Sequence, residues 1–173
     1  MKHSIYLIIH NVRSCYNVGS LLRSADAFGV SKVYMSGYTP YPRLKNDPRL
    51  PHIADKMTHQ IHKSALGAET SVSWAWEPDI FALLARLTKN GVEIAALEQT
   101  ETAKSLPGYG TQKDIAIIVG REVEGLEEEV LKAVDVHLQI PMLGAKESLN
   151  VASAGAIALY QLRFSLQEMD RSG

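Results

Sequence analysis

Polar side chains that could bind or activate a ligand gather at three corners of the sequence, each between a short apolar run and a segment with helical periodicity. The residues at these corners are Asn17 and Arg23 in the first, Glu122 in the second, and Ser148 and Asn150 in the third. In open α/β proteins, ligands bind where the carboxyl ends of strands meet the amino ends of helices. We therefore expect the three corners to form one composite site.

The first corner offers an amide and a guanidinium. Arg23 lies on an otherwise apolar helical face, and its fork of donors matches the oxygens of a phosphate. The alternative is an ion pair with Asp26, one helical turn further along the chain. For Asn17 taken alone, capping the following helix is the simpler role.

The second corner carries a possible hydrogen-bond acceptor between two glycines. Gly120 and Gly125 bracket a bend at which backbone groups can approach a ligand closely. Glu122, between them, can accept a hydrogen bond from a hydroxyl or an amine. The alternative is the start of a helix whose acidic residues match the helix dipole.

The third corner combines apolar walls with polar side chains. Ile140, Met142 and Leu149 would suit a flat aromatic ring such as adenine, and Ser148 and Asn150 can form hydrogen bonds with a ligand. Capping the closing helix is an equally good explanation for Ser148 or Asn150 when each is considered alone. Capping explains the three corners together less well.

Alternating strands and helices must position these corners. We predict strands at residues 4–10, 32–37, 71–77, 92–99, 115–120 and 135–142, and helices at 18–28, 78–89, 125–134 and 149 to about 169. Asn17 and Gly29 would cap the first helix, and Pro78 would begin the second. The run at 115–120 does not alternate and should be buried on both faces. This order predicts an α/β fold with a parallel sheet.

A long segment without periodicity separates the second and third predicted strands. Residues 38–63 contain four prolines, five lysines or arginines, three histidines and two tyrosines, and we predict a loop there. Basic groups mixed with aromatic rings suit contact with RNA phosphates and bases. The alternative is a connection stiffened by proline with solvated charges. His59 and His62 have no third ligand at a recognisable spacing, so we predict no metal site.

The composition is that of an ordinary globular protein. The 173 residues, 46% of them hydrophobic and 21% charged, suit a single domain at 1–173. The apolar runs are too short to span a membrane, and the first residues lack a signal-peptide cleavage site. Cys15 is the only cysteine, which fits a reducing compartment. We expect a cytoplasmic protein with no membrane contact.

The net charge of −1 conceals an asymmetry along the chain. Residues 1–63 contain nine basic and three acidic residues, and the rest of the chain contains nine basic and sixteen acidic ones. The excess of basic residues in the first third of the chain indicates a surface that binds a polyanion. The alternative is that the charges are unevenly distributed along the chain without a functional reason.

Three motifs resemble a known family. The segments NVGSLLRSADAFG, IIVGREVEGL and IPMLGAKESLNVASAGAIALYQL are similar, in order and spacing, to the signature motifs of the SpoU-type RNA 2′-O-ribose methyltransferases of the SPOUT class. The resemblance covers nearly the whole chain, and its third motif is the most specific. It implies a parallel-sheet α/β domain with a C-terminal deep trefoil knot, S-adenosylmethionine as cofactor, and a homodimer with RNA across its interface.

The resemblance also assigns residues. The catalytic set it implies is Arg23, Asn17, Glu122, Ser148 and Asn150, and the cofactor pocket it implies is Leu97, Gly120, Ile140, Met142, Ser148 and Leu149. The candidates for RNA binding are Arg13, Arg23, Arg43, Lys45 and Arg49. Because a guanidinium stays protonated in proteins, we expect Arg23 to bind phosphate or steer the hydroxyl rather than act as a base.

The substrate is less defined than the reaction. The minimal size resembles the small family members that methylate tRNA, so we expect tRNA, with ribosomal RNA as the alternative. A non-catalytic RNA-binding module would explain the fold, but every polar motif position is filled. A dinucleotide-binding domain is disfavoured because no G-x-G-x-x-G follows the first predicted strand.

Overall fold

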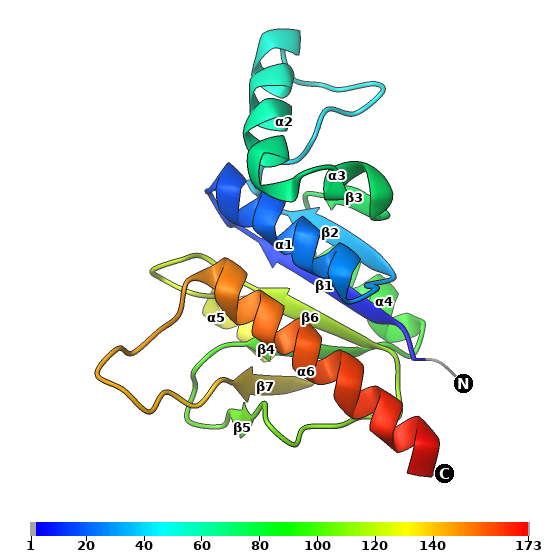
Figure 1. Cartoon of the computed structure of the whole chain (residues 1–173), viewed down its shortest axis with the longest axis vertical. Helices are drawn as coiled ribbons and strands as arrows, with labels where there is room; N and C mark the ends of the chain where they lie inside the picture. The colour runs from blue at the N-terminus through cyan, green and yellow to red at the C-terminus, as the bar shows by residue number, and fades with distance from the viewer. Residues whose placement is uncertain (1–2, 173) are drawn as a thin grey trace.

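The computed structural model describes residues 3–172, and its centre is a parallel sheet with strand order β3-β2-β1-β6-β4-β7-β5 (Figure 1). The strands are β1 (Ile5–His10), β2 (Lys32–Ser36), β3 (Trp74–Glu77), β4 (Glu93–Leu97), β5 (Lys104–Ser105), β6 (Ile115–Val119) and β7 (Val136–Gln139). Every strand pairing in the sheet is parallel. The predicted α/β class is therefore confirmed.

Helices cover both faces of the sheet (Figure 1). They are α1 (Cys15–Ala27), α2 (Pro51–Ala65), α3 (Ala68–Ser71), α4 (Ile80–Lys89), α5 (Glu128–Lys132) and α6 (Val151–Ser172). Leu7 and Ile9 of β1 pack in the same apolar cluster as α1 and α6, and Ile8 packs with α4 and α5 on the opposite face. Because side chains alternate along a strand, a strand between two helical layers must be apolar throughout.

Two predictions about the core are confirmed. Strand β6 is buried at every position, as its uninterrupted apolar sequence predicts. The helix predicted at 78–89 is present as α4, and it buries the apolar residues at helical spacing, which are Ile80, Leu83, Leu84 and Leu87. The trefoil knot stays a prediction from the family resemblance.

The predicted start of α1 is wrong. The helix begins at Cys15, and its N-cap is Ser14, whose hydroxyl accepts a hydrogen bond from the Asn17 backbone N–H at 3.3 Å. Asn17 therefore lies in the first turn and does not cap the helix. Since Ser14 already satisfies that free N–H group, the Asn17 side chain can bond elsewhere.

Other boundaries also differ from those predicted. Pro78 does not begin α4, because Asp79 is the N-cap and accepts from the Ala82 N–H at 3.1 Å. Strand β7 ends at Gln139, and the residues that follow leave the sheet. The predicted helix at 125–134 is confined to α5, and the loop after β4 contains the short strand β5.

The prediction of a loop throughout residues 38–63 is wrong in its second half, which forms α2. Pro51 occupies the first turn of this helix, where its missing N–H costs nothing. The helix buries only Ala54, Ile61 and Ala65, a stripe too weak to be visible as apolar periodicity. Most of its surface is exposed.

An aromatic stack orders the remaining loop before α2. The rings of Tyr41 and Trp76 stack with centroids 4.8 Å apart, and the Arg49 guanidinium lies 3.6 Å above the Tyr41 ring. Stacking of this kind adds to the area buried and fixes the ring positions. The loop is therefore packed onto β3 rather than extended into solvent.

Close contacts join α1 to its two neighbouring helices. A Cβ added to Gly19 would collide with the Ser64 hydroxyl and the Ile61 carbonyl, so glycine allows α1 and α2 to approach closely. On α6, the buried Arg163 side chain donates to the Phe28 carbonyl at 2.8 Å and the Gly29 carbonyl at 2.6 Å. These bonds satisfy carbonyls at the end of α1.

Across the described residues, no helix is both long enough and apolar enough to cross a bilayer.

Candidate functional site

The structure brings the three polar corners together at the carboxyl edge of the sheet. The Asn17 side-chain nitrogen donates to Glu122 Oε1 at 2.9 Å, and the Asn150 side-chain nitrogen donates to Asn17 Oδ1 at 3.2 Å. Asn17 thus links a residue that follows β6 to one that precedes α6. One residue from each corner therefore joins a single hydrogen-bonded group, as the sequence predicts, whereas Arg23 and Ser148 do not take part in it.

Asn150 performs two roles at once. Its side-chain oxygen accepts from the Ala152 N–H at 2.9 Å, which caps the start of α6. Its side-chain nitrogen remains available for the bond to Asn17. Capping and participation in the site were alternatives in the sequence, and the structure shows both.

A cavity opens beside this group, where the carboxyl ends of β4, β6 and β7 meet the start of α6. The six predicted cofactor-pocket residues all line it, namely Leu97, Gly120, Ile140, Met142, Ser148 and Leu149. Glu122 also lines it, and the cavity has a volume of about 140 Å³.

The cavity combines an apolar interior with polar groups that tie its walls together. Gln99 donates from its side chain to the Glu147 carbonyl at 2.6 Å, which links the end of β4 to the exposed loop before α6. Glu98 accepts from the Leu126 N–H at 3.0 Å. A Cβ on Gly120 would lie 2.9 Å from the Leu126 side chain, so this wall needs a glycine.

Sequence reasoning missed a second polar cluster at the ends of β1 and β2. Glu127 accepts from the Asn11 side chain at 2.8 Å and faces His10 Nε2 at 3.3 Å and Arg121 at 3.7 Å. His10 also contacts the Ser36 hydroxyl at 3.1 Å. The pair His10-Asn11 at the end of a buried strand was a visible signal, but its partner lies over a hundred residues away.

Burial controls the protonation of this cluster. Burial lowers the pKa of His10 below its ordinary value of 6.5, and nearby Glu127 only partly opposes this effect. Burial works to raise the pKa of Glu127, but hydrogen bonds from its own backbone and from Asn11 lower it overall. The structure therefore favours a neutral His10 beside an ionised Glu127.

Arg23 stands apart from the cavity. Its side chain is exposed on α1, and within residues 3–172 it has no ion pair or hydrogen bond. The predicted alternative, an ion pair with Asp26, is wrong, because Asp26 instead accepts from the Ser71 hydroxyl at 2.8 Å. The guanidinium remains available to an external anion.

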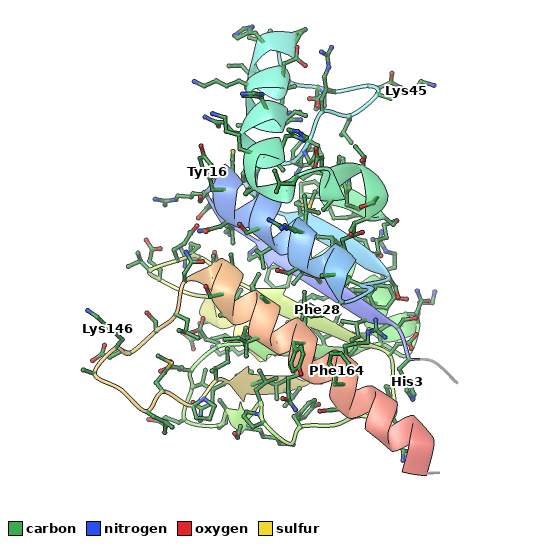
Figure 2. All side chains as sticks on the ribbon, viewed as in Figure 1. His3, Tyr16, Phe28, Lys45, Lys146 and Phe164 are labelled. Carbon is green, nitrogen blue, oxygen red and sulfur yellow. The ribbon has the colours of Figure 1, made fainter. Side chains whose placement is uncertain are left out.

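The other RNA-binding candidates fall into different environments. Arg13 is exposed and lies over the Tyr38 ring, 5.7 Å from its centroid. Lys45 is exposed on the loop before α2, where Figure 2 labels it. Arg43 forms an exposed ion pair with Asp55 at 2.8 Å. A phosphate can reach Arg13 and Lys45 directly.

Arg49 must be removed from this set. Its guanidinium is bound to the Asp47 carboxylate, donates to the Tyr41 carbonyl at 3.0 Å, and has a side chain only 16% exposed. The bond to Arg49 holds the pKa of Asp47 far below its usual range. Since its donors are already used within the loop, Arg49 stabilises the fold rather than binding RNA.

In the described part of the chain, no group of three or more His, Cys, Asp or Glu residues could hold a metal ion.

Known proteins resemble this chain along most of its length. The SpoU rRNA methylase family matches residues 4–160 of the chain. The 23S rRNA (guanosine-2′-O-)-methyltransferase RlmB of Coxiella burnetii is 32% identical over 162 residues, which cover 92% of this chain and 58% of that enzyme. The chain spans 57–62% of the length of the first relatives it matches.

Solved structures share the fold. The SpoU methyltransferase AviRb of Streptomyces viridochromogenes, in complex with the cofactor AdoMet, superimposes with a TM-score of 0.78 at 20% identity, over 98% of this chain and 59% of AviRb. A structure described as giving insight into 2-OH methylation of C/U34 on tRNA superimposes with a TM-score of 0.76 at 24% identity, over 97% of this chain and 99% of that one. Both confirm the α/β architecture.

Proposed function

The chain belongs to the SpoU rRNA methylase family, and from this premise we propose that it transfers a methyl group from S-adenosylmethionine to a ribose 2′-hydroxyl of RNA. The observation that carries the proposal is the Glu122–Asn17–Asn150 hydrogen-bonded group at a cavity lined by all six predicted cofactor residues. Residues from three distant segments have no reason to converge there if each only caps a helix.

The cavity residues suit the cofactor. Ile140, Met142 and Leu149 provide apolar walls for the adenine ring, and Ser148 provides a hydroxyl at the same wall. Gly120 lines the same cavity, and its missing side chain leaves room for Leu126 behind the wall. When bound, S-adenosylmethionine supplies a methyl group already activated by its sulfonium.

The protein's own residues must then align the ribose hydroxyl for the transfer. Alignment of two reacting groups is worth several orders of magnitude in rate. Asn17 and Glu122 are fixed by their mutual bond and present an amide and a carboxylate to the ribose. Arg23, exposed on the same helix as Asn17, binds a phosphate of the substrate.

A homodimer is part of the proposal. Three large apolar side chains of α6 are exposed, namely Ile157, Tyr160 and Phe164, with Tyr160 exposed by 54%. Tyr160 also contacts the rings of Phe28 and Phe164, the latter two labelled in Figure 2. An apolar face of this kind suits burial against a second copy. Light scattering of the purified chain tests this part.

For the substrate we propose tRNA, with ribosomal RNA as the second candidate. The similar structure concerned with C/U34 of tRNA matches along 99% of its own length. The relative from Coxiella burnetii, which is named for 23S rRNA, supports the second candidate. A substrate assay separates the two.

The test is methyl transfer from labelled S-adenosylmethionine to unmodified tRNA and, separately, to unmodified ribosomal RNA. After digestion to nucleosides, we expect label in a 2′-O-methylated nucleoside from the tRNA pool. Label only in the ribosomal pool would reverse the choice of substrate. No label in either pool, with cofactor binding established by calorimetry, would reduce the protein to a binding module.

A further inference from the structure

The outer part of helix α2 projects from the body of the protein, while its inner end packs against α1. Figure 1 shows it rising from the start of α1, beyond the edge of the sheet. Only its Ala54, Ile61 and Ala65 positions are buried, so most of the helix surface faces solvent. Packing within the protein therefore uses only a small part of this helix, and its remaining surface can contact a partner.

The solvent face of α2 carries a basic stripe. Four exposed residues, His52, Lys56, His59 and Lys63, follow one another at intervals of four, three and four positions. At 100° per residue these positions fall within an arc of about 60°, nearly opposite the buried face. The stripe contains no acidic residue.

The neighbouring acids do not neutralise this stripe. Asp55 lies beside it on the helix and is paired with Arg43 at 2.8 Å. Glu69 is paired with His62, which lies outside the stripe. Lys56 and Lys63 have no ion pair among the residues that the structure describes.

We propose that the stripe formed by His52, Lys56, His59 and Lys63 binds the phosphate backbone of the substrate RNA beside the reacting nucleotide. The inference rests on the proposed function and adds a recognition surface to it. Ammonium groups bind phosphates as point charges, and imidazoles donate to phosphates or stack on bases. A row of both along a helix suits a chain of phosphates better than a single small anion.

The attachment of α2 places one end of the stripe beside the site. The Ser64 hydroxyl donates to the Tyr16 carbonyl at 2.8 Å, and Tyr16 immediately precedes Asn17. Figure 2 labels Tyr16 at the junction of α1 and α2. At 1.5 Å per residue the stripe extends about 17 Å outward from Lys63. An RNA with one nucleotide at Asn17 therefore has its flanking phosphates within reach.

The loop before α2 holds the outer part of the helix in place. The Arg43 N–H donates to the Thr58 hydroxyl at 2.8 Å, and Arg49 contacts the Met57 sulfur at 3.3 Å. A surface that is already ordered loses less entropy on binding. The roles of Arg43 and Arg49 in this scheme are to support α2.

The test compares two double variants that remove the same charge. Lys56→Gln/Lys63→Gln removes both ammonium groups of the stripe. Lys89→Gln/Lys113→Gln is the matched control, because both lysines are exposed and lie at the opposite, amino edge of the sheet. Glutamine keeps helix propensity close to that of lysine, and circular dichroism checks the fold.

Binding of a labelled tRNA transcript and of a ribosomal RNA fragment is measured by anisotropy over a range of salt concentrations. For the stripe variant we expect Kd to rise about 10-fold and the slope of log K against log salt to fall by about 1.5 in magnitude. The control should bind like the wild type. In the methylation assay KM for RNA should rise, with kcat and the Kd for S-adenosylmethionine unchanged.

The possible outcomes separate this inference from the proposed function. Unchanged RNA binding by a folded stripe variant overturns the stripe, even if the wild type methylates RNA. Loss of RNA binding in the stripe variant supports it, even if the wild type methylates neither RNA. The variant Lys56→Arg/Lys63→Arg keeps both positive charges and should bind RNA like the wild type. Weak RNA binding by this variant would show that the weak binding of the glutamine variant is not caused by the lost charges, which would overturn the stripe.

Discussion

Asn150 donates its side-chain nitrogen to Asn17 across 133 residues of sequence, while its side-chain oxygen caps α6. One amide thus sets both where the last helix begins and how the Asn17 side chain is turned. The orientation of Asn17 in turn presents its own nitrogen to Glu122. The geometry of the site is coupled to the start of α6.

Asn150→Asp should separate these two roles. The aspartate keeps an oxygen for the cap but cannot donate to Asn17, so the free energy of unfolding should change little. We expect kcat/KM to fall about 10- to 100-fold, because misalignment of the reacting groups is costly. Thermal denaturation and steady-state kinetics measure the two effects. Asn150→Ala should lower stability as well, and an active Asn150→Asp enzyme would contradict the assigned role.

A second pair of variants tests whether Asn17 acts in the site rather than in the helix. Asn17→Ala removes the bond to Glu122 and should reduce activity about 10- to 100-fold with little loss of stability. Ser14→Ala removes the cap of α1 and should cost about 1 kcal/mol of stability while the remaining folded enzyme stays active. A large loss of stability in Asn17→Ala with activity retained would contradict the role assigned to Asn17.

Arg23→Ala should abolish methyl transfer and leave cofactor binding intact, because the side chain is exposed and absent from the described cavity wall. Arg23→Lys should recover only part of the activity, since an ammonium lacks the bidentate fork. Calorimetry with S-adenosylmethionine and the labelled transfer assay provide the two measurements. Equal loss of binding and turnover in Arg23→Ala would place the residue in the cofactor pocket.

The stability of the protein should depend on pH through His10. The pKa of His10 is lowered in the folded state, so below its ordinary value of 6.5 the unfolded chain binds the proton more readily. Stability should therefore fall as pH drops below about 6.5, and further once Glu127 becomes protonated. His10→Gln should flatten the first part of this dependence. Denaturation at pH 5 and pH 7.5 checks it, and identical slopes for the two proteins would refute it.

Gly19→Ala should disturb the α1–α2 junction without touching the cavity. The added Cβ collides with Ser64 and the Ile61 carbonyl, and overpacking of this kind costs about 1–3 kcal/mol. We expect a lower melting temperature and weaker RNA binding, with an unchanged Kd for S-adenosylmethionine. Gly144→Ala is a suitable control, because nothing lies close to its added Cβ. Equal melting temperatures for both variants would show that α2 can shift without cost.

The elements with strong apolar patterns were predictable from the sequence. The uninterrupted apolar run of β6 predicts a strand buried on both faces, and the four-residue stripe of α4 predicts a helix buried on one face. The three polar corners were also predictable, because the carboxyl edge of a parallel sheet collects the residues that follow its strands. The role of the Asn17 amide in joining the corners was not predictable, because it depends on Ser14 rather than Asn17 being the N-cap of α1.

The features that escaped prediction depend on contacts without a local signature. Helix α2 buries too few residues to create a visible stripe, and its start at Pro51 resembles one more proline in a proline-rich loop. Arg49 looked like a cation for RNA, but Asp47 and the Tyr41 ring already engage it. The pairing of His10 with Glu127 joins two distant parts of the chain that no short-range pattern relates.

The docking of α2 also bears on how such proteins diversify. The helix packs against α1 and α3, and its loop stacks on Trp76 at the sheet edge furthest in strand order from β7 and β5. Insertions, deletions and changes of charge in this segment can accumulate under selection while the cavity at β4, β6 and β7 stays as it is. If the proposed function holds, the choice of RNA and the transfer of the methyl group would therefore change through separate sets of substitutions.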